Sequence, residues 1–277
     1  MMMIMPNTVV IFTDLDGTLL DPFSYSWEAA QPALTLIKKK AVPLVICSSK
    51  TRAEIETIRN SLDNHDPLIC ENGGGIFIPK TYFDFSFTFH KETAYYEIIE
   101  LGTPYAQLRK VLCTVAQQTG IELKGFGDFS VDEITAQTGL PIEAAQLAKQ
   151  REYDEPFVLI GSEDQGKRVL QLITQWGLHW TKGSRYYHLT GSNDKGKAVK
   201  LLVNLFKQKH GKVITIGLGD SLNDLPMLQV VDYPILVQKP GGQYEESVRL
   251  SGLLKVQGVG PEGWRTAVLK LLASVGN

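Results

Sequence analysis

Two short apolar runs, each ending in an acidic loop, restrict the fold of this chain more than any other feature. Residues 8–13 read TVVIFT and lead into DLDG, and residues 212–217 read KVITIG and lead into LGDSLND. Apolar, β-branched runs of this kind are typical of parallel strands that are buried on both faces. We therefore expect both acidic loops at the carboxyl edge of one parallel sheet.

Two more strand candidates follow the first one and also end in polar loops. Residues 42–47 lead into Ser48, and residues 67–70 lead into a loop with the sequence ENGGG. Between them, the sequence from Thr51 to Glu54 matches a capping box, which predicts a helix that starts directly after the serine loop. Repeated steps of this type place the loops on the same rim of the sheet.

The middle of the chain has a different texture. It contains helical stretches near 104–119 and 140–150, strand candidates at 157–160 and 186–189, and alternating phenylalanines in 83–89. A helix at 195–207 then returns the chain to the first pattern. We predict an α/β protein with two parts: a Rossmann-like, doubly wound parallel-sheet core formed by residues 1–84 and 190–277, and an inserted α+β domain formed by residues 85–189.

The bulk properties exclude several classes of partner. The chain has 277 residues, enough for two domains, and its formal net charge of -2 gives no field that would attract nucleic acid or an anionic membrane. No run approaches the roughly 20 apolar residues of a membrane span, and we expect a cytoplasmic protein. Cys47, Cys70 and Cys113 lack CxxC spacing and are expected to be reduced core thiols. The oligomeric state stays open.

Four aspartates in the two acidic loops indicate a metal site. Asp14 and Asp16 are separated by one residue, and Asp220 and Asp224 follow the distant strand. Carboxylates that converge on one sheet edge repel one another unless a cation lies among them, and a hard oxygen-ligand set suits Mg²⁺. Taken singly, each aspartate fits a helix cap or a turn equally well. Their joint placement favours the metal site.

Ser48 and Lys195 complete a set of residues suited to phosphoryl transfer. Ser48 lies between a strand and a helix N-terminus, where a hydroxyl and backbone N–H groups can bind a phosphate oxygen. Lys195 begins a predicted helix, where its ammonium can contact phosphate as a point charge. A carboxylate can then be the nucleophile and form an aspartyl-phosphate.

These residues resemble, in order and spacing, the four motifs of haloacid dehalogenase superfamily phosphatases. The motifs are DLDGTL from Asp14, then Ser48, then Lys195, then GDSLND ending at Asp224. The resemblance covers the whole chain, because the long insertion between the serine and lysine motifs looks like the large cap of the Cof-type subgroup, the C2B type. This subgroup has a Rossmann-like core with a mobile lid.

The resemblance also implies roles for the motif residues. Asp14 is expected to attack phosphorus, and Asp16 to protonate the leaving alcohol and later to activate water. Ser48 and Lys195 are expected to stabilise the phosphoryl group. The implied cofactor is Mg²⁺, bound by Asp14, by Asp16 through its backbone carbonyl and by Asp220, with support from Asn223 and Asp224.

Five finer segments resemble mannosyl-3-phosphoglycerate phosphatases, a group within this family. They are residues 48–52 (SSKTR), 71–75 (ENGGG), 151–157 (REYDEPF), 182–188 (KGSRYYH) and 260–264 (GPEGW). The implied substrate is a small phosphorylated sugar–glycerate, 2-O-mannosyl-3-phosphoglycerate, which yields mannosylglycerate, a compatible solute. A bidentate arginine suits its carboxylate. The candidate substrate-binding residues are Ser49, Lys50, Asn72, Gly73, Gly74, Arg151, Glu152, Lys182 and Arg185.

Several alternatives stay open. The substrate could be glucosyl-3-phosphoglycerate or another sugar phosphate, because the choice between epimers depends on few pocket contacts. A phosphomutase shares the aspartyl-phosphate but protects it from water, and a binding module would bind without turnover. Tyr186, Tyr187 and Trp264 could stack on a sugar or belong to the core.

Overall fold

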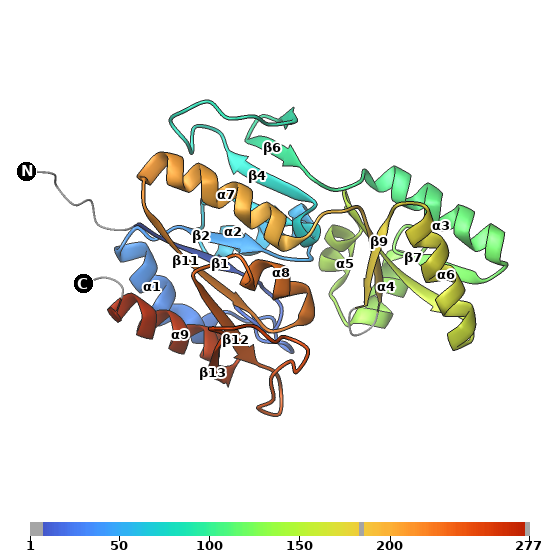
Figure 1. Ribbon diagram of the computed structural model, residues 1–277. Helices are drawn as coiled ribbons and strands as arrows, with labels where there is room; N and C mark the ends of the chain where they lie inside the picture. Colours follow the sequence, from blue (N-terminus) through green and yellow to red (C-terminus); the bar gives the residue numbers. More distant parts are fainter. Residues whose placement is uncertain (1–7, 183–185, 275–277) are drawn as a thin grey trace, which may run out of the picture.

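The computed structural model describes residues 8–182 and 186–274, which form two β-sheets with their own helices (Figure 1). One sheet has nine strands and the other has four. The chain leaves the larger sheet once and returns to it once, so the four-stranded unit is an insertion. Figure 1 shows this unit beside the larger one, which contains both the first and the last of the described residues.

The nine-stranded sheet consists of six parallel strands and an antiparallel extension of three. In sheet order the strands are β13 (Leu254–Val259), β12 (Tyr233–Gln238), β11 (Val213–Gly219), β1 (Thr8–Thr13), β2 (Leu44–Cys47), β3 (Leu68–Cys70), β4 (Gly75–Pro79), β6 (Tyr96–Glu100) and β5 (Lys91–Glu92). β1 is central, with Phe12 opposite Gly217 of β11 and Val45 of β2. The predicted parallel strands are confirmed, and the carboxyl ends of β1 and β11 are adjacent.

Helices cover both faces of this sheet, as a doubly wound fold requires. Apolar side chains of α1 (Gln31–Lys39), α2 (Arg52–Ser61) and α9 (Pro261–Ser274) pack on one face. Those of α7 (Lys195–His210) and α8 (Leu225–Leu228) pack on the other. Within residues 8–182 and 186–274, no helix has both the length and the apolar character that crossing a membrane requires.

The predicted capping box is confirmed at the start of α2. Thr51 Oγ1 accepts a hydrogen bond from Glu54 N at 3.1 Å, and Glu54 Oε2 accepts one from Thr51 N at 2.9 Å. These bonds satisfy backbone donors that the first turn of a helix leaves unpaired. They place the N-cap of α2 three residues beyond Ser48 and so keep the loop after β2 short.

The phenylalanines between residues 83 and 89 form no strand. Phe83, Phe85 and Phe87 pack in the same cluster as Phe206 of α7. The ring centroids of Phe83 and Phe206 are 5.4 Å apart. Strands β5 and β6 follow this segment and extend the large sheet to Glu100, beyond the expected boundary at residue 84. The division into two domains stays a prediction, and we propose that it falls after Glu100.

The inserted unit is an antiparallel sheet with helices on both faces. In sheet order its strands are β7 (Glu122–Gly125), β8 (Asp154–Ile160), β10 (Tyr187–Thr190) and β9 (His179–Lys182). α3 (Tyr105–Thr119) and α6 (Glu163–Gln175) cover one face, and α4 (Val131–Thr138) and α5 (Ile142–Ala148) cover the other. An α+β insertion in a doubly wound α/β core is the predicted fold class.

The structure shows the environments of two cysteines and of Trp264 that the sequence left as expectations, and it places Cys113 differently from the prediction. Cys47 and Cys70 are buried free thiols as predicted, but Cys113 is exposed, because it lies on the outer side of α3. Trp264 is fully buried, and its Nε1 donates to Thr13 Oγ1 at 3.0 Å. Trp264 therefore belongs to the core and is not available for stacking on a sugar.

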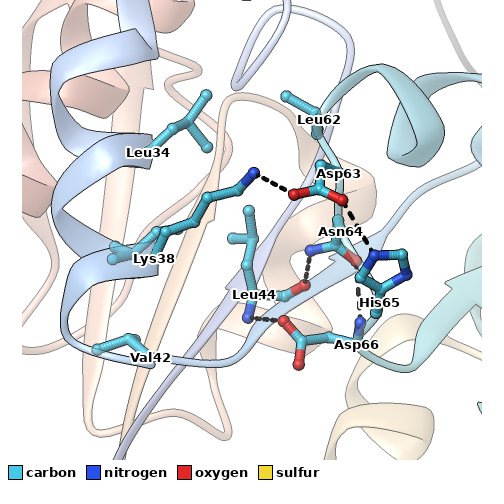
Figure 2. A pocket seen from close by; sticks show the side chains of 10 residues that line it. Leu34, Lys38, Val42, Leu44, Leu62, Asp63, Asn64, His65 and Asp66 are labelled. Atoms are coloured by element: carbon cyan, nitrogen blue, oxygen red, sulfur yellow. Dashed lines mark hydrogen bonds and ion pairs between the residues drawn. The ribbon is translucent and has the colours of Figure 1, made fainter.

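Polar side chains at the opposite, amino edge of the sheet hold the start of β2 (Figure 2). Asn64 Nδ2 donates to the carbonyl of Leu44 at 2.8 Å, and Leu44 N donates to Asp66 Oδ2 at 2.7 Å. Exposed Asp63 pairs with Lys38, and these residues line a cavity of about 70 Å³. These contacts give the polar residues at this edge a structural role, which is to hold the start of β2. Ligands of such folds bind at the other edge.

Candidate active site

Asp14 and Asp16 lie where β1 ends, at the carboxyl edge of the parallel sheet. Asp14 N donates to the carbonyl of Leu218 at 2.9 Å, which joins the loop after β1 to the end of β11. The side chain of Asp14 is buried, whereas that of Asp16 is partly exposed. The two acidic loops therefore meet, as the strand pattern predicts.

Lys195 lies between two aspartates from these loops. Its Nζ is 2.6 Å from Asp14 Oδ1 and 2.6 Å from Asp224 Oδ1. Lys195 is the first residue of α7, whose N-cap residue Asp194 accepts a hydrogen bond from Lys197 N at 2.8 Å. Lys195 and Asp224 are both fully or almost fully buried. If one of these three charged side chains were removed, the charges of the others would stay buried without compensation.

Asp224 also organises the loop after β11. Its Oδ2 accepts hydrogen bonds from the backbone N of Asp220 at 3.0 Å and of Ser221 at 3.1 Å. The side chain of Asp220 accepts a hydrogen bond from Thr18 Oγ1 at 3.3 Å. One carboxylate oxygen from each of Asp14, Asp220 and Asp224 lies within 4.8 Å of the others. Three oxygens at this spacing can hold a small divalent cation.

The electrostatics of the acidic loops favour such a cation. Burial raises the pKa of Asp14 well above its usual range; Lys195 opposes this effect, and Asp224 and Asp220 add to it. Burial and repulsion by Asp224 likewise raise the pKa of Asp220 to about 7. Burial alone would lower the pKa of Lys195, but Asp14 and Asp224 raise it. The loops thus contain more carboxylate charge than one ammonium compensates.

Ser48 and Lys50 lie in the buried loop after β2. Ser48 Oγ accepts a hydrogen bond from Lys50 N at 3.2 Å. Lys50 Nζ lies 3.0 Å from Asp16 Oδ2 and 3.6 Å from Glu54 Oε1, so it pairs with carboxylates of the protein. The other oxygen of Asp16, Oδ1, is buried and has no hydrogen-bond partner in the described part of the chain. Asp16 therefore has one oxygen held by Lys50 and one that no described group of the protein uses.

The loop after β3, η2 (Glu71–Gly73), reaches the same edge in an unusual backbone conformation. Glu71, Asn72 and Gly73 have φ values of 48°, 55° and 85°. A Cβ atom on Gly73 would lie 2.3 Å from the carbonyl oxygen of Asp194, so only glycine permits this approach to the start of α7. Asn72 Oδ1 accepts a hydrogen bond from Asn223 Nδ2 at 3.3 Å. Asn72 is therefore connected to the loop after β11.

Arg151 and Glu152, which precede β8, bring the inserted unit against the core loops. Arg151 Nη1 donates to the carbonyl of Ser49 at 3.0 Å. Glu152 Oε1 accepts a hydrogen bond from Arg52 Nε at 3.1 Å. Both residues reach the carboxyl edge of the core, but each side chain already has partners in the protein. Their roles in substrate binding stay predictions.

Glu71 and Gly74 contact the next residues of the inserted unit, Glu152 and Tyr153. The two carboxyl oxygens of Glu71 accept hydrogen bonds from the backbone N of Glu152 at 2.9 Å and of Tyr153 at 2.8 Å. Tyr153 packs so closely on Gly74 that a Cβ atom on residue 74 would lie 2.3 Å from Tyr153 Cβ. Tyr153 Oη donates to Glu100 Oε1 at 2.6 Å. These contacts attach the insertion to the core beside the candidate site.

No described contact connects Lys182, a predicted substrate residue, to this edge of the core sheet. Lys182 ends β9, and its Nζ lies 5.2 Å from the ring centroid of Tyr187. Tyr187 packs with the side chains under α3 and α6. Arg185 lies outside the described residues. Both assignments stay predictions.

Sequence reasoning missed one pair of residues near the site. His188 Nδ1 lies 2.9 Å from Asp154 Oδ2, and Asn72 Nδ2 donates to the same oxygen at 3.3 Å. Asp154 and His188 fall within two of the segments on which the finer resemblance rests, so their position was a usable signal. The pairing of β8 with β10 that brings them together was not visible in the sequence.

Known proteins resemble this chain over most of its length. The family model of the haloacid dehalogenase-like hydrolases matches residues 11–240. A glucosyl-3-phosphoglycerate/mannosyl-3-phosphoglycerate phosphatase of Methanococcoides burtonii is 49% identical over 97% of this chain and 98% of its own. A mannosyl-3-phosphoglycerate phosphatase of Pyrococcus furiosus is 41% identical over 82% of this chain and 90% of its own.

A solved structure shares the whole fold. The subclass IIB sugar phosphatase BT4131 superposes with a TM-score of 0.67 at 16% identity, over 95% of this chain and 99% of its own. At this identity the likeness shows the fold alone, and it includes the inserted unit as well as the core. Because the family model and two relatives above 40% identity match most of the sequence, the chain belongs to the haloacid dehalogenase-like hydrolase family.

Proposed function

We propose that this chain is a Mg²⁺-dependent phosphatase that hydrolyses 2-O-mannosyl-3-phosphoglycerate to mannosylglycerate and phosphate through an aspartyl-phosphate. The observation that carries the reaction type is the contact of Asp14 with buried Lys195, beside Asp220 and Asp224. The substrate class is supported by relatives whose names give mannosyl- and glucosyl-3-phosphoglycerate.

In the first half of the reaction, Asp14 attacks phosphorus and the bond from phosphorus to the ester oxygen breaks. Asp16 gives a proton to that oxygen, so the alcohol leaves neutral. Asp16 suits this role because its buried Oδ1 lacks a partner among residues 8–182 and 186–274, while Lys50 holds its Oδ2 at 3.0 Å. Lys50 thereby fixes the orientation of the carboxyl group.

In the second half, Asp16 takes a proton from a water molecule, and the water oxygen attacks the phosphoryl group on Asp14. The bond between phosphorus and Asp14 breaks, phosphate is released, and both carboxyl groups return to their starting states. Ser48 and Lys195 stabilise the phosphoryl oxygens throughout. Lys195 Nζ already contacts Asp14, so the aspartyl-phosphate forms next to this ammonium.

The acidic loops fit a magnesium ion by number and type of donor. We assign Asp14, the backbone carbonyl of Asp16 and Asp220 as its ligands. Asp224 already accepts hydrogen bonds from Lys195 and from two backbone N–H groups. It is therefore better suited to hold the loop after β11 than to bind the ion directly. Bound there, Mg²⁺ supplies positive charge that offsets the repulsion between the attacking carboxylate and the phosphate.

Arg151 is our candidate for recognition of the glycerate carboxylate. Its guanidinium lies against the loop after β2 through the carbonyl of Ser49. Burial alone would lower the pKa of Arg151, but surrounding carboxylates, Asp154 foremost, raise it. A charged guanidinium at the junction of core and insertion can bind a carboxylate in bidentate geometry. Lys50 and Glu152 are further candidates for substrate binding, and their ion pairs with Asp16 and Arg52 hold the loops in place.

A panel of purified phosphate esters tests this function. It includes mannosyl- and glucosyl-3-phosphoglycerate, 3-phosphoglycerate and hexose 6-phosphates, each assayed for phosphate release with Mg²⁺. We expect the highest kcat/KM for mannosyl-3-phosphoglycerate. An equal or higher value for a hexose 6-phosphate would overturn the substrate assignment.

Glucosyl-3-phosphoglycerate is the second candidate, because the Methanococcoides relative is named for both sugars. The two esters differ in the configuration of one hydroxyl group, so the ratio of their kcat/KM values measures the preference directly. A phosphomutase would instead return an isomerised ester. Release of one phosphate for each ester consumed excludes that reaction.

A further inference from the structure

His188 and Asp154 form a hydrogen-bonded pair that the mechanism above does not use. Asp154 begins β8 and is fully buried, whereas 19% of the His188 side chain on β10 is exposed. In the antiparallel pairing, Asp154 lies opposite Thr190 and His188 lies opposite Pro156, so the two side chains are diagonal neighbours on one face. His188 Nδ1 is 3.1 and 2.9 Å from the two Asp154 oxygens.

Asn72 connects this pair to the acidic loops. Its Nδ2 donates to Asp154 Oδ2, and its Oδ1 accepts a hydrogen bond from Asn223 Nδ2, each at 3.3 Å. The next residue, Gly73, packs on the start of α7, where a Cβ atom would lie 3.0 Å from Lys195 N. The pair is therefore separated from the start of α7 by only the short loop that contains Asn72 and Gly73. Asn72 has a left-handed backbone conformation, which asparagine adopts more readily than most non-glycine residues.

The second ring nitrogen of His188, Nε2, is not used by the described part of the protein. It has no hydrogen-bond partner in residues 8–182 and 186–274, and 19% of the His188 side chain is exposed. The carboxylate on Nδ1 restricts rotation of the ring and presents Nε2 in one direction. A ring oriented in advance loses little further entropy when it binds a ligand.

We propose that His188 Nε2 binds an oxygen atom of the alcohol that the enzyme releases, either a sugar hydroxyl or the glycerate carboxylate, and that Asp154 is its positioning residue. The inference rests on the proposed function and names a specificity residue for it. The core holds the phosphoryl group, whereas His188 belongs to the inserted unit and contacts only the organic part of the ester. His188 therefore affects which ester binds more than how fast its phosphoryl group is transferred.

Two matched substitutions separate binding of the ligand from support of the fold. In His188→Asn the shorter amide can keep the bond to Asp154 but does not reach the position of Nε2. In His188→Gln the longer amide can reach that position. We expect His188→Asn to raise KM for mannosyl-3-phosphoglycerate by about tenfold or more, as for a lost hydrogen bond to a ligand, and His188→Gln to raise it less.

The same variants are assayed with p-nitrophenyl phosphate, which lacks both sugar and glycerate. We expect its kcat/KM to stay within about twofold of the wild-type value. This change is smaller than the one that loss of a hydrogen bond to the ligand would cause. Asp154→Asn should raise KM for the sugar–glycerate ester and add little to His188→Asn in the double variant, because it acts through the same ring. Fully additive effects of the two substitutions would overturn the positioning role.

Equal losses with both esters, or an unchanged KM in His188→Asn, would overturn the inference about His188. With 3-phosphoglycerate, a retained effect assigns Nε2 to the carboxylate, and a lost effect assigns it to the sugar; each result supports the inference. If wild-type enzyme prefers another ester of the panel, the substrate assignment fails separately. The variants are then compared on that ester against p-nitrophenyl phosphate, which still tests His188.

Discussion

Lys195 Nζ lies 2.6 Å from Asp14 Oδ1, and both side chains are buried. The contact joins the first residue of α7 to the loop after β1, 181 positions away in the chain. Burial raises the pKa of Asp14, and Lys195 offsets part of that effect. The ammonium thereby favours the negative charge that Asp14 needs as a nucleophile.

Asp14→Asn should abolish phosphate release while the protein stays folded. The amide keeps the size of the side chain and an acceptor for Lys195, but it is not a competent nucleophile; loss of a nucleophile lowers kcat by roughly 10⁴-fold or more. Phosphate release with Mg²⁺ and thermal unfolding measure the two effects. Asp63→Asn, at the opposite edge of the sheet (Figure 2), is the control and should keep full activity. Persistent turnover by Asp14→Asn would contradict the mechanism.

Lys195→Met should destabilise the protein and change its response to metal. The substitution leaves Asp14 and Asp224 buried without their partner, which lowers the free energy of unfolding by about 3–5 kcal/mol. The uncompensated charge should also make stabilisation by Mg²⁺ larger than in wild type. Denaturant titrations with and without Mg²⁺ measure both effects.

Lys197→Met on the same helix is the matched control for this substitution. Lys197 has 57% of its side chain exposed and lies 3.7 Å from Asp194, so its loss should change stability by at most about 0.5 kcal/mol. Equal Mg²⁺ effects in wild type and Lys195→Met would show that the ion does not share the charge of these aspartates.

The meeting of the four polar loops could be predicted from the sequence, because parallel strands that follow one another by way of helices end at the same edge. Asp14, Ser48, Lys195 and Asp224 each adjoin a strong strand or helix pattern. The capping box at Thr51 was equally visible, because both of its partners lie within four residues. Short-range patterns therefore located the candidate site.

Contacts across the chain could not be predicted in this way. The pairing of Lys50 with Asp16 depends on how closely two loops approach, and no periodicity encodes that distance. The side of the sheet on which Lys182 lies depends on its register opposite Tyr187 of β10. The pairing of β6 with β4 likewise added a segment to the large sheet that its own pattern did not assign there.

Gly74→Ala should weaken the attachment of the inserted unit. The added Cβ would lie 2.3 Å from Tyr153 Cβ, and overpacking of this kind costs about 1–3 kcal/mol. Gly166→Ala in α6 is the matched control, because its Cβ would meet Leu159 at an ordinary 3.7 Å and the helix should gain about 0.5–1 kcal/mol. Thermal unfolding should rank the proteins Gly166→Ala, wild type, Gly74→Ala. Wild-type stability of Gly74→Ala would contradict close packing at this position.

Glu71 should make the stability of the protein depend on pH. Burial raises its pKa to about 8 from an ordinary value of 4.5, with Arg151 opposing the shift and Asp154 adding to it. Below 4.5 the group is protonated in the folded and the unfolded chain. Between 4.5 and about 8 the unfolded chain loses the proton while the folded chain retains it, so stability falls as pH rises. Above about 8 this contribution is gone.

Glu71→Gln lacks this ionisation and isolates its effect. The free energy of unfolding of wild type minus that of Glu71→Gln should fall between pH 5 and 8, by at most about 1.4 kcal/mol for each pH unit, and then level off. Denaturant titrations at several pH values measure the difference, in which titrations common to both proteins cancel. A difference that rises with pH would show the opposite balance: the backbone N–H groups of Glu152 and Tyr153 would then hold the carboxylate ionised against its burial.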